Sequence, residues 1–291
     1  MTTLAAPPRT RTTDLLLAAL APVSWGTTYV VTTTLLPPDR PLLAATLRAL
    51  PAGLVLLAAT RSLPSGSWWW KSAVLGLLNF GAFFPLLFFA AYRLPGGVAA
   101  TIGSVQPLIV ALLSVLILGL VPGRIMLYAA LAGTGGVALL TLTSEARLDP
   151  LGIAAMLAAT SLMGMAMVLA KKWGRPASPL KMTGWQLTIG GLVLVPITLA
   201  AEGVPTSLTT TNVLGFTYLG VFGTAIAYAL WFRGIDRLTP TSVSLLGLTN
   251  PLVATIAGLV VLGQTLTGWQ IAGFTIALGA LVAGQTFSRK A

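Results

Sequence analysis

The chain has 291 residues, of which 56% are hydrophobic and only 8% are charged, whereas a soluble domain carries about 25% charged residues. This composition excludes an ordinary soluble domain and predicts an integral membrane protein. The chain contains no cysteine and no histidine, so we expect no disulfide, no metal site and no cofactor. The net charge of +11 would suit a nucleic-acid partner, but in a membrane protein it reflects topology, and we expect no nucleic acid.

Apolar runs of about 20 residues, the length that crosses a bilayer, predict an all-α fold with ten transmembrane helices. In chain order they cover residues 15–36, 41–59, 72–92, 96–119, 125–142, 151–170, 182–200, 213–232, 241–262 and 268–287. Segments rich in proline and glycine mark several of the loops between them. Polar tails at residues 1–14 and 288–291 complete the chain.

An internal duplication organises these helices. Matching positions include Gly103 with Gly247 and Gln106-Pro107 with Asn250-Pro251 at an offset of 144 residues, and Arg48 with Gln186 at an offset of 138. We therefore predict a first repeat at 15–142, a linker at 143–150 and a second repeat at 151–287. Five helices are an odd number, so the second repeat enters the membrane upside down. Inverted repeats around a central cavity are typical of transporters that work by alternating access.

The basic side chains predict the orientation of the chain. Thirteen of the 17 lie on the side of the N-terminus, three lie on the other side, and Arg48 lies within a span. The positive-inside rule then places both termini in the cytoplasm, and an even number of spans requires the same. We expect a multi-pass protein of the bacterial inner membrane.

Two repeat-related amide–proline pairs, Gln106-Pro107 and Asn250-Pro251, lie within the predicted fourth and ninth helices. A proline cannot donate to the carbonyl four residues earlier, and these carbonyls belong to Gly103 and Gly247. One interpretation is a pair of substrate-facing kinks with open carbonyls and amide donors. The alternative is a pair of packing kinks with amide bonds between helices.

Arg48 lies inside the predicted second helix, where an arginine costs about 2.5–3.5 kcal/mol on insertion scales. It either binds a substrate carboxylate, snorkels to the outer interface or bonds to helix-end carbonyls. No Asp or Glu lies in the middle of a predicted span, which argues against a proton relay and against organic-cation cargo. A pathway of amides, hydroxyls and aromatic rings suits a neutral or zwitterionic solute.

Other polar and aromatic side chains within the spans are candidates for the pathway, with lipid or helix packing as the alternative. Asn79 is the most informative, because a polar group in lipid is costly unless it is buried. The predicted pathway residues are Trp25, Arg48, Asn79, Phe83, Gln106, Trp185, Tyr228 and Asn250, with Gly103, Pro107, Gly247 and Pro251 as kink or hinge positions. No motif for nucleotide binding or nucleophilic catalysis is present, so we expect no catalytic residue and no enzyme.

Trp25-Gly26, Arg48, the prolines of the fourth and ninth helices and the duplicated layout resemble the drug/metabolite transporter superfamily, in its ten-helix EamA-type branch. The resemblance spans nearly the whole chain and implies two inverted five-helix halves that export small metabolites. Among bacterial members, the chain is most similar to exporters of aromatic and other neutral amino acids. Many relatives carry a glutamate where this chain has Leu120 and Gln264, so facilitated, gradient-driven efflux is the simpler expectation.

The leading hypothesis is an amino-acid exporter that works by alternating access. The alternatives are a carrier of nucleotide sugars or sugar phosphates, an exporter of cationic drugs, and a membrane scaffold or channel. The expected partners are a zwitterionic or neutral small molecule and the lipid bilayer, and both a monomer and a dimer are compatible with the sequence.

Overall fold

The computed structural model describes residues 11–94, 96–141, 149–205, 207–262 and 266–287, and every regular element within these ranges is a helix. The predicted C-terminal tail, most of the predicted N-terminal tail and linker, and Gln264 lie outside the described residues. In chain order the elements are α1 (Arg11–Gly26), α2 (Thr28–Leu35), α3 (Pro41–Thr60), α4 (Trp68–Gly76), η1 (Leu77–Ala82), α5 (Phe83–Arg93), α6 (Gly96–Gly103), α7 (Gln106–Leu118), α8 (Arg124–Thr141), α9 (Pro150–Trp173), α10 (Pro179–Ala201), α11 (Thr210–Gly220), η2 (Val221–Ile226), α12 (Ala227–Arg237), α13 (Pro240–Leu246), α14 (Thr249–Leu262) and α15 (Gly268–Phe287).

Eight helical stretches of the described chain are long and apolar enough to cross a membrane. They correspond to the first eight predicted spans. The predicted ninth span is helical as α13 and α14, which a break separates, and the predicted tenth is α15, whose ends carry the polar Gln270 and Gln285. These two are not among the eight, so the count of ten spans stays a prediction.

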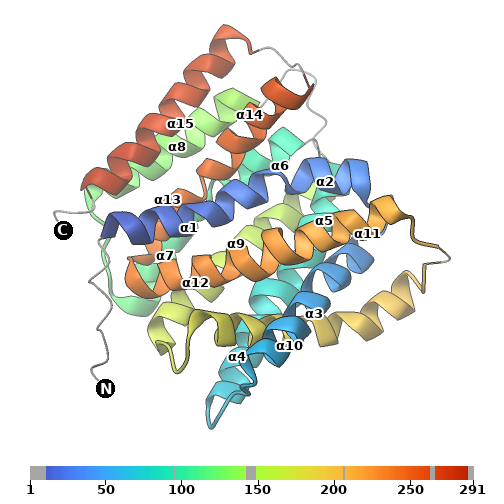
Figure 1. Ribbon diagram of the computed structural model, residues 1–291. Coiled ribbons are helices and arrows are strands. Elements are labelled where there is room, and N and C mark those ends of the chain that lie inside the picture. The colour runs from blue at the N-terminus through green and yellow to red at the C-terminus, as the bar shows by residue number, and fades with distance from the viewer. Residues whose placement is uncertain (1–10, 95, 142–148, 206, 263–265, 288–291) are drawn as a thin grey trace, which may run out of the picture.

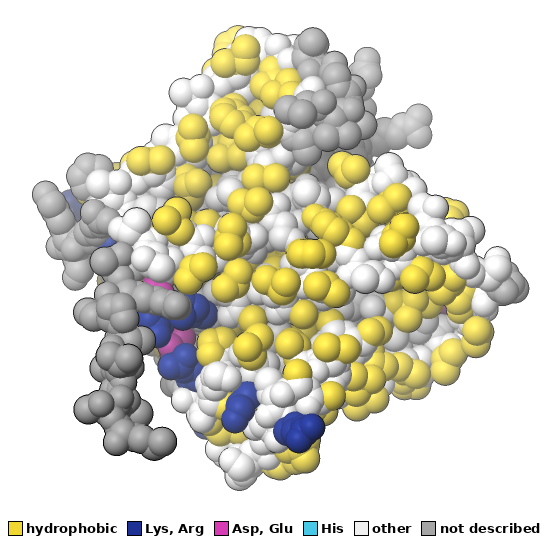
Figure 2. Space-filling view, viewed as in Figure 1, with side chains coloured by type: hydrophobic (Ala, Val, Ile, Leu, Met, Phe, Trp, Pro, Cys, Tyr) yellow, Lys and Arg dark blue, Asp and Glu magenta, His cyan; other side chains and the backbone are white. Residues whose placement is uncertain are grey.

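The outer surface is apolar, as a lipid-facing surface must be. Figure 2 shows hydrophobic side chains over the visible face, while Lys and Arg gather along one edge. Residues such as Val55, Leu116 and Val121 are more than half exposed, and an apolar surface of this extent marks a membrane contact in a chain of this composition. α1 begins and α15 ends on the same side of the molecule (Figure 1).

Three of the predicted spans contain irregularities that hydrophobicity alone did not reveal. The first is divided at Thr27, whose N–H bonds to the Ser24 carbonyl instead of continuing a regular helix. The third and eighth contain the π-helical segments η1 and η2, which lie 144 residues apart. The bounds of α5 and α12 also differ by 144, and those of α6 and α13, and of α7 and α14, do so to within one residue.

The helices pack in equivalent pairs across the two halves of the chain. α3 packs along α10, and α8 packs along α15, at opposite sides of the molecule (Figure 1). The contact of α1 with α12 has its counterpart in that of α9 with α5, and the contact of α1 with α14 has its counterpart in that of α9 with α7. The largest core cluster lies between the halves, and it contains Phe80, Phe84, Tyr228 and Trp231.

Candidate functional site

Two helix breaks face each other near the centre of the molecule. Gly103 ends α6, and Gln106 begins α7 before Pro107. In the second half, α13 ends before Gly247, and α14 begins just before Asn250. Both breaks follow from the prolines, which remove a helical hydrogen bond at each position.

One carbonyl at each break accepts a hydrogen bond within the protein. Gly247 O accepts a hydrogen bond from the Asn250 N–H at 3.0 Å, because a tight turn replaces the bond that Pro251 cannot make. In the first half, Ser104 O accepts from the Thr134 hydroxyl at 2.9 Å. The Gly247 carbonyl thus already accepts one hydrogen bond from a local turn, and whether it also faces a substrate stays a prediction.

A cavity of about 100 Å³ lies where the two breaks meet. Its lining includes five pairs of positions that are 144 residues apart: Ala100 and Ser244, Gly103 and Gly247, Ser104 and Leu248, Gln106 and Asn250, and Pro107 and Pro251. The cavity therefore straddles the two halves of the duplication.

Most of the predicted pathway residues meet at this cavity. It is lined by Trp25, Arg48, Phe83, Gln106, Tyr228 and Asn250 and by all four kink positions. Two predicted residues do not line it. Asn79 Nδ2 donates to Gln186 Oε1 at 3.0 Å inside the protein, and Trp185 Nε1 donates to the backbone carbonyl of Ser62.

Arg48 reaches the cavity from α3 and is only 2% exposed. Its Nε donates to the Thr224 hydroxyl at 2.8 Å, and its Nη2 donates to Gly223 O at 2.9 Å. Both acceptors belong to η2, and π-helical segments often occur at functional sites. The guanidinium carbon lies 4.7 Å from the centroid of the Phe84 ring, a cation–π distance. A hydroxyl, a backbone carbonyl and an aromatic ring thus contact this guanidinium at the cavity wall.

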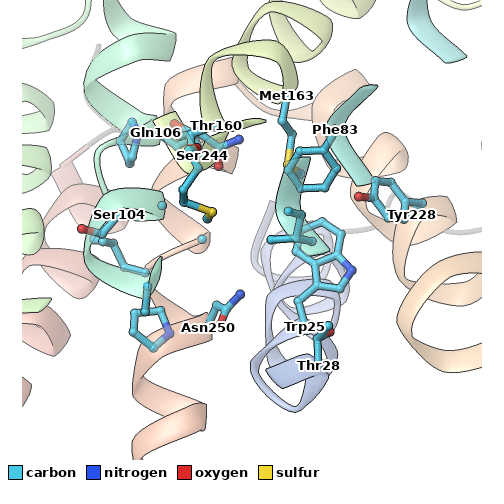
Figure 3. Close-up of a pocket in the computed structure, with 18 of the residues that line it drawn as sticks. Trp25, Thr28, Phe83, Ser104, Gln106, Thr160, Met163, Tyr228, Ser244 and Asn250 are labelled. Atoms are coloured by element: carbon cyan, nitrogen blue, oxygen red, sulfur yellow. The ribbon is translucent and has the colours of Figure 1, made fainter. Parts of the chain in front are cut away.

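Aromatic rings form one wall of the cavity (Figure 3). The ring centroids of Trp25 and Tyr228 are 5.0 Å apart. The ring of Phe80, which does not line the cavity, packs against Tyr228 with a centroid distance of 4.7 Å. Trp25 Nε1 donates to Gly223 O at 2.9 Å, so this carbonyl orients both Trp25 and Arg48. A wall of this kind binds apolar or planar groups and attracts cations to its ring faces.

Amides and hydroxyls provide the polar part of the lining. Figure 3 shows Gln106, Thr160 and Ser244 together on the side opposite the rings, and Asn250 pointing toward the space between. Asn250 Oδ1 is buried, and no hydrogen-bond partner for it exists among the described residues. No aspartate or glutamate belongs to the described lining.

Sequence reasoning missed several residues of the lining. Thr28, Thr160, Met163 and Ser244 all contribute, although none was a candidate. Met163 could have been found from the duplication, because Trp25-Gly26 falls on Met163-Gly164 at the offset of 138 that relates Arg48 to Gln186. The threonines and the serine carry no comparable signal, because such residues are common in spans of this chain.

Ion pairs lie at the ends of the helices, away from the cavity. Asp14 pairs with Arg233 and Arg237, and Arg93 pairs with Asp149 at 3.1 Å. Asp149 also caps α9. The hydrogen bond from the Gly152 N–H, and then that from Arg93, lower the pKa of the Asp149 carboxyl below its usual 3.8. Leu120, the counterpart of Gln264, is half exposed.

Known proteins resemble the chain over nearly its full length. It matches the model of the EamA-like transporter family over residues 12–142 and again over 150–283. It is 48% identical over 273 residues to Protein PecM of Dickeya dadantii, which covers 93% of this chain and 92% of that protein. It is 30% identical over 277 residues to an uncharacterized transporter of Synechocystis, which covers 87% and 84% of the two chains.

A solved crystal structure superposes with a TM-score of 0.80 over 97% of this chain and 99% of that chain, and at 19% identity this likeness concerns the fold alone. The family matches, by contrast, extend over both halves of the chain, and the relative at 48% identity spans almost the same length. The chain is therefore a member of the EamA-like transporter family.

Proposed function

We propose that this protein exports small metabolites across the bacterial inner membrane by alternating access, through ten spans arranged as two inverted five-helix repeats. Three findings support the arrangement. Helix bounds recur at an offset of 144 residues, contacts between the halves occur in equivalent pairs, and the family model matches the chain once in each half. Halves of this kind rock about a shared site and open it to either side in turn.

The central cavity is the proposed cargo site. The observation that carries this assignment is its lining by equivalent positions of the two halves, including Gln106 with Asn250 and both helix breaks. A site on the axis that relates the halves is reachable from both faces without moving the cargo. Broken helices at mid-membrane commonly line such sites in transporters.

The lining favours an amino acid with an apolar or aromatic side chain. Arg48 supplies one positive charge for the cargo carboxylate, and its planar guanidinium suits bidentate binding. Trp25, Phe83 and Tyr228 supply a surface for the side chain. Carriage is proposed to follow the cargo gradient, because the described lining offers no carboxylate to relay a proton.

The termini are proposed to lie in the cytoplasm. The sequence assigns most basic residues to the side on which α1 begins, and among them Arg233, Arg237 and Arg175 pair with acids. The positive-inside rule places that side in the cytoplasm. Relatives in Escherichia coli are named inner membrane transporters, which agrees with this location.

Counterflow in liposomes tests the proposal. Purified protein is reconstituted into vesicles loaded with unlabelled phenylalanine, and uptake of labelled phenylalanine is followed without an ion gradient. We expect saturable, stereoselective uptake that falls at least tenfold in Trp25→Ala. Trp185→Ala is the matched control, since that tryptophan lies outside the cavity, and its KM should stay within about twofold. Folded wild-type protein without counterflow for any neutral amino acid would refute the assignment.

A second candidate, a carrier of sugar phosphates or nucleotide sugars, is favoured by one observation. Arg48 lines the cavity, and arginine binds phosphate groups as well as it binds carboxylates. Competition by glucose 6-phosphate or uridine diphosphate glucose in the same vesicles decides between the two. Unsaturable flux would instead indicate a channel, and no flux at all a scaffold.

A further inference from the structure

One part of the cavity is formed where the break between α1 and α2 meets the break between α13 and α14. A Cβ on Gly26 would lie 2.9 Å from the Asn250 carbonyl and 3.0 Å from Val253, so only glycine allows this approach. Thr28 and Asn250 both line the cavity here, and Figure 3 shows them with Trp25 at the same end of the view.

This part of the cavity presents two buried oxygens that have no partner among the described residues. Thr28 is 6% exposed, and its Oγ1 lacks a hydrogen bond. Asn250 Oδ1 lacks one as well. Native proteins rarely leave buried polar atoms unsatisfied, and exceptions point to a water, an ion or a ligand. Here both residues line a cavity, so a donor on the cargo is a candidate partner for these oxygens.

The third component is an aromatic ring that the protein holds in place. Trp25 Nε1 is bound to Gly223 O, and its ring packs edge-on against Trp231 at 5.0 Å. A fixed indole face beside neutral oxygens attracts a cation without a carboxylate. Arg48 shares the acceptor Gly223 O with Trp25, and its other contacts include Thr224 and the Phe84 ring.

We infer that Asn250, Thr28 and Trp25 form a subsite for the ammonium group of the cargo, an inference that rests on the proposed amino-acid function. The cargo ammonium donates to Asn250 Oδ1 and Thr28 Oγ1 and lies against the Trp25 ring, while the carboxylate pairs with Arg48. Since the subsite is neutral and Arg48 is positive, the site selects zwitterions. It rejects amines that bring no carboxylate, because their charge adds to that of Arg48.

Three ligands separate the contributions of the cargo ammonium and the cargo carboxylate to binding by the reconstituted wild-type protein. Phenylalanine has both groups, 3-phenylpropanoate lacks the ammonium, and 2-phenylethylamine lacks the carboxylate. Each competes against labelled phenylalanine in counterflow, and ligand-induced change in Tm provides a second readout of binding. We expect phenylalanine to compete about tenfold or more better than 3-phenylpropanoate, the ratio for one hydrogen bond to a charged group, and 2-phenylethylamine to compete least.

Two threonines on α2 provide a matched pair of variants. Thr28→Val removes the hydroxyl from the cavity and should reduce the preference for phenylalanine over 3-phenylpropanoate at least threefold. Thr32 lies one turn later and is also buried, and its Oγ1 likewise has no partner among the described residues, but it does not line the cavity. Thr32→Val should leave the preference within a factor of two. Equal effects of the two variants would overturn the subsite.

A gain of function completes the test. Asn250→Asp adds an acid at the subsite and should improve competition by 2-phenylethylamine at least tenfold. Gln106→Glu adds the same charge at the equivalent position of the other half, and its gain should be at least threefold smaller. If Asn250→Asp still catalyses phenylalanine counterflow but has the same ligand preferences as wild type, the subsite is refuted and the proposed cargo is not. Folded wild-type protein that neither transports nor binds phenylalanine would refute both the proposed cargo and the subsite.

Discussion

Arg48→Gln separates the contribution of this side chain to stability from its contribution to transport. Glutamine is the residue that the second half carries at the equivalent position, Gln186. It retains one amide donor toward Gly223 O but has no charge. We expect the variant to fold, and we expect its KM for phenylalanine to rise about 10- to 100-fold, because the cargo carboxylate loses a hydrogen bond to a charged partner.

The contacts of Arg48 set the magnitude of the stability change. The substitution removes the charge-assisted hydrogen bond to Thr224, worth about 1.5–3 kcal/mol, and makes the bond to Gly223 O a neutral one. A cation–π contact with Phe84, worth about 0.5–2 kcal/mol, is lost as well. The substitution also removes the cost of an arginine in the membrane, about 2.5–3.5 kcal/mol. The terms nearly cancel, so the free energy of unfolding should change by less than about 2 kcal/mol.

The assay is counterflow of labelled phenylalanine over a range of concentrations, with the Tm of the purified protein measured in parallel. Arg48→Lys is the companion variant, since it retains the charge without the planar fork, and it should recover part of the affinity. An unchanged KM in Arg48→Gln would refute a role in cargo binding. A collapse of the fold in Arg48→Gln, but not in Arg48→Lys, would refute the near cancellation.

Three further variants test the packing, the helix cap and the buried amide pair. Gly136→Ala should lower Tm, since its Cβ would lie 2.6 Å from Ala277 N on α15 and overpacking costs about 1–3 kcal/mol, whereas Gly135→Ala, with open space around it, should be neutral or stabilising. Asp149→Asn should lower Tm at pH 7. That difference should persist above a pH of about 3.8, the usual carboxyl pKa, and shrink as the pH falls through the lowered pKa of the folded state, which Tm against pH will show. Asn79→Leu should cost about 1–3 kcal/mol by leaving Gln186 without its partner, yet leave the KM for phenylalanine unchanged, and a raised KM would return Asn79 to the pathway.

The duplication explains why much of the cavity was accessible from sequence. Gln106 and Asn250 were identified because each precedes a proline, and two weak signals at a constant offset reinforce each other. A proline in a helix has one predictable effect on the backbone, and both helices break where expected. Helical periodicity within an apolar span gives far less information, since lipid and protein core accept the same side chains.

Asn79 and Trp185 illustrate that limit. A polar group in a span must face a cavity or a polar partner, and a single sequence does not distinguish the two. The partner of Asn79, Gln186, is 107 residues away. The π-helical segments were also invisible, because η1 and η2 share a position in the duplication but little sequence: Asn79 is aligned with Gly223, and Phe80 with Thr224.

The two halves differ in the polar side chain that contacts the π-helical segment, although the segments themselves occupy equivalent positions. In each half, the helix that follows the first span sends a polar side chain to the π-helical segment of the other half: Arg48 donates to Gly223 O, and Gln186 bonds to Asn79. These contacts are equivalent under the duplication, so the fold requires a polar link at both places but a charge at neither. The charge is present only on the link that lines the cavity. Under the proposed function, the charge of Arg48 serves the cargo carboxylate, which the amide pair of the other link does not do.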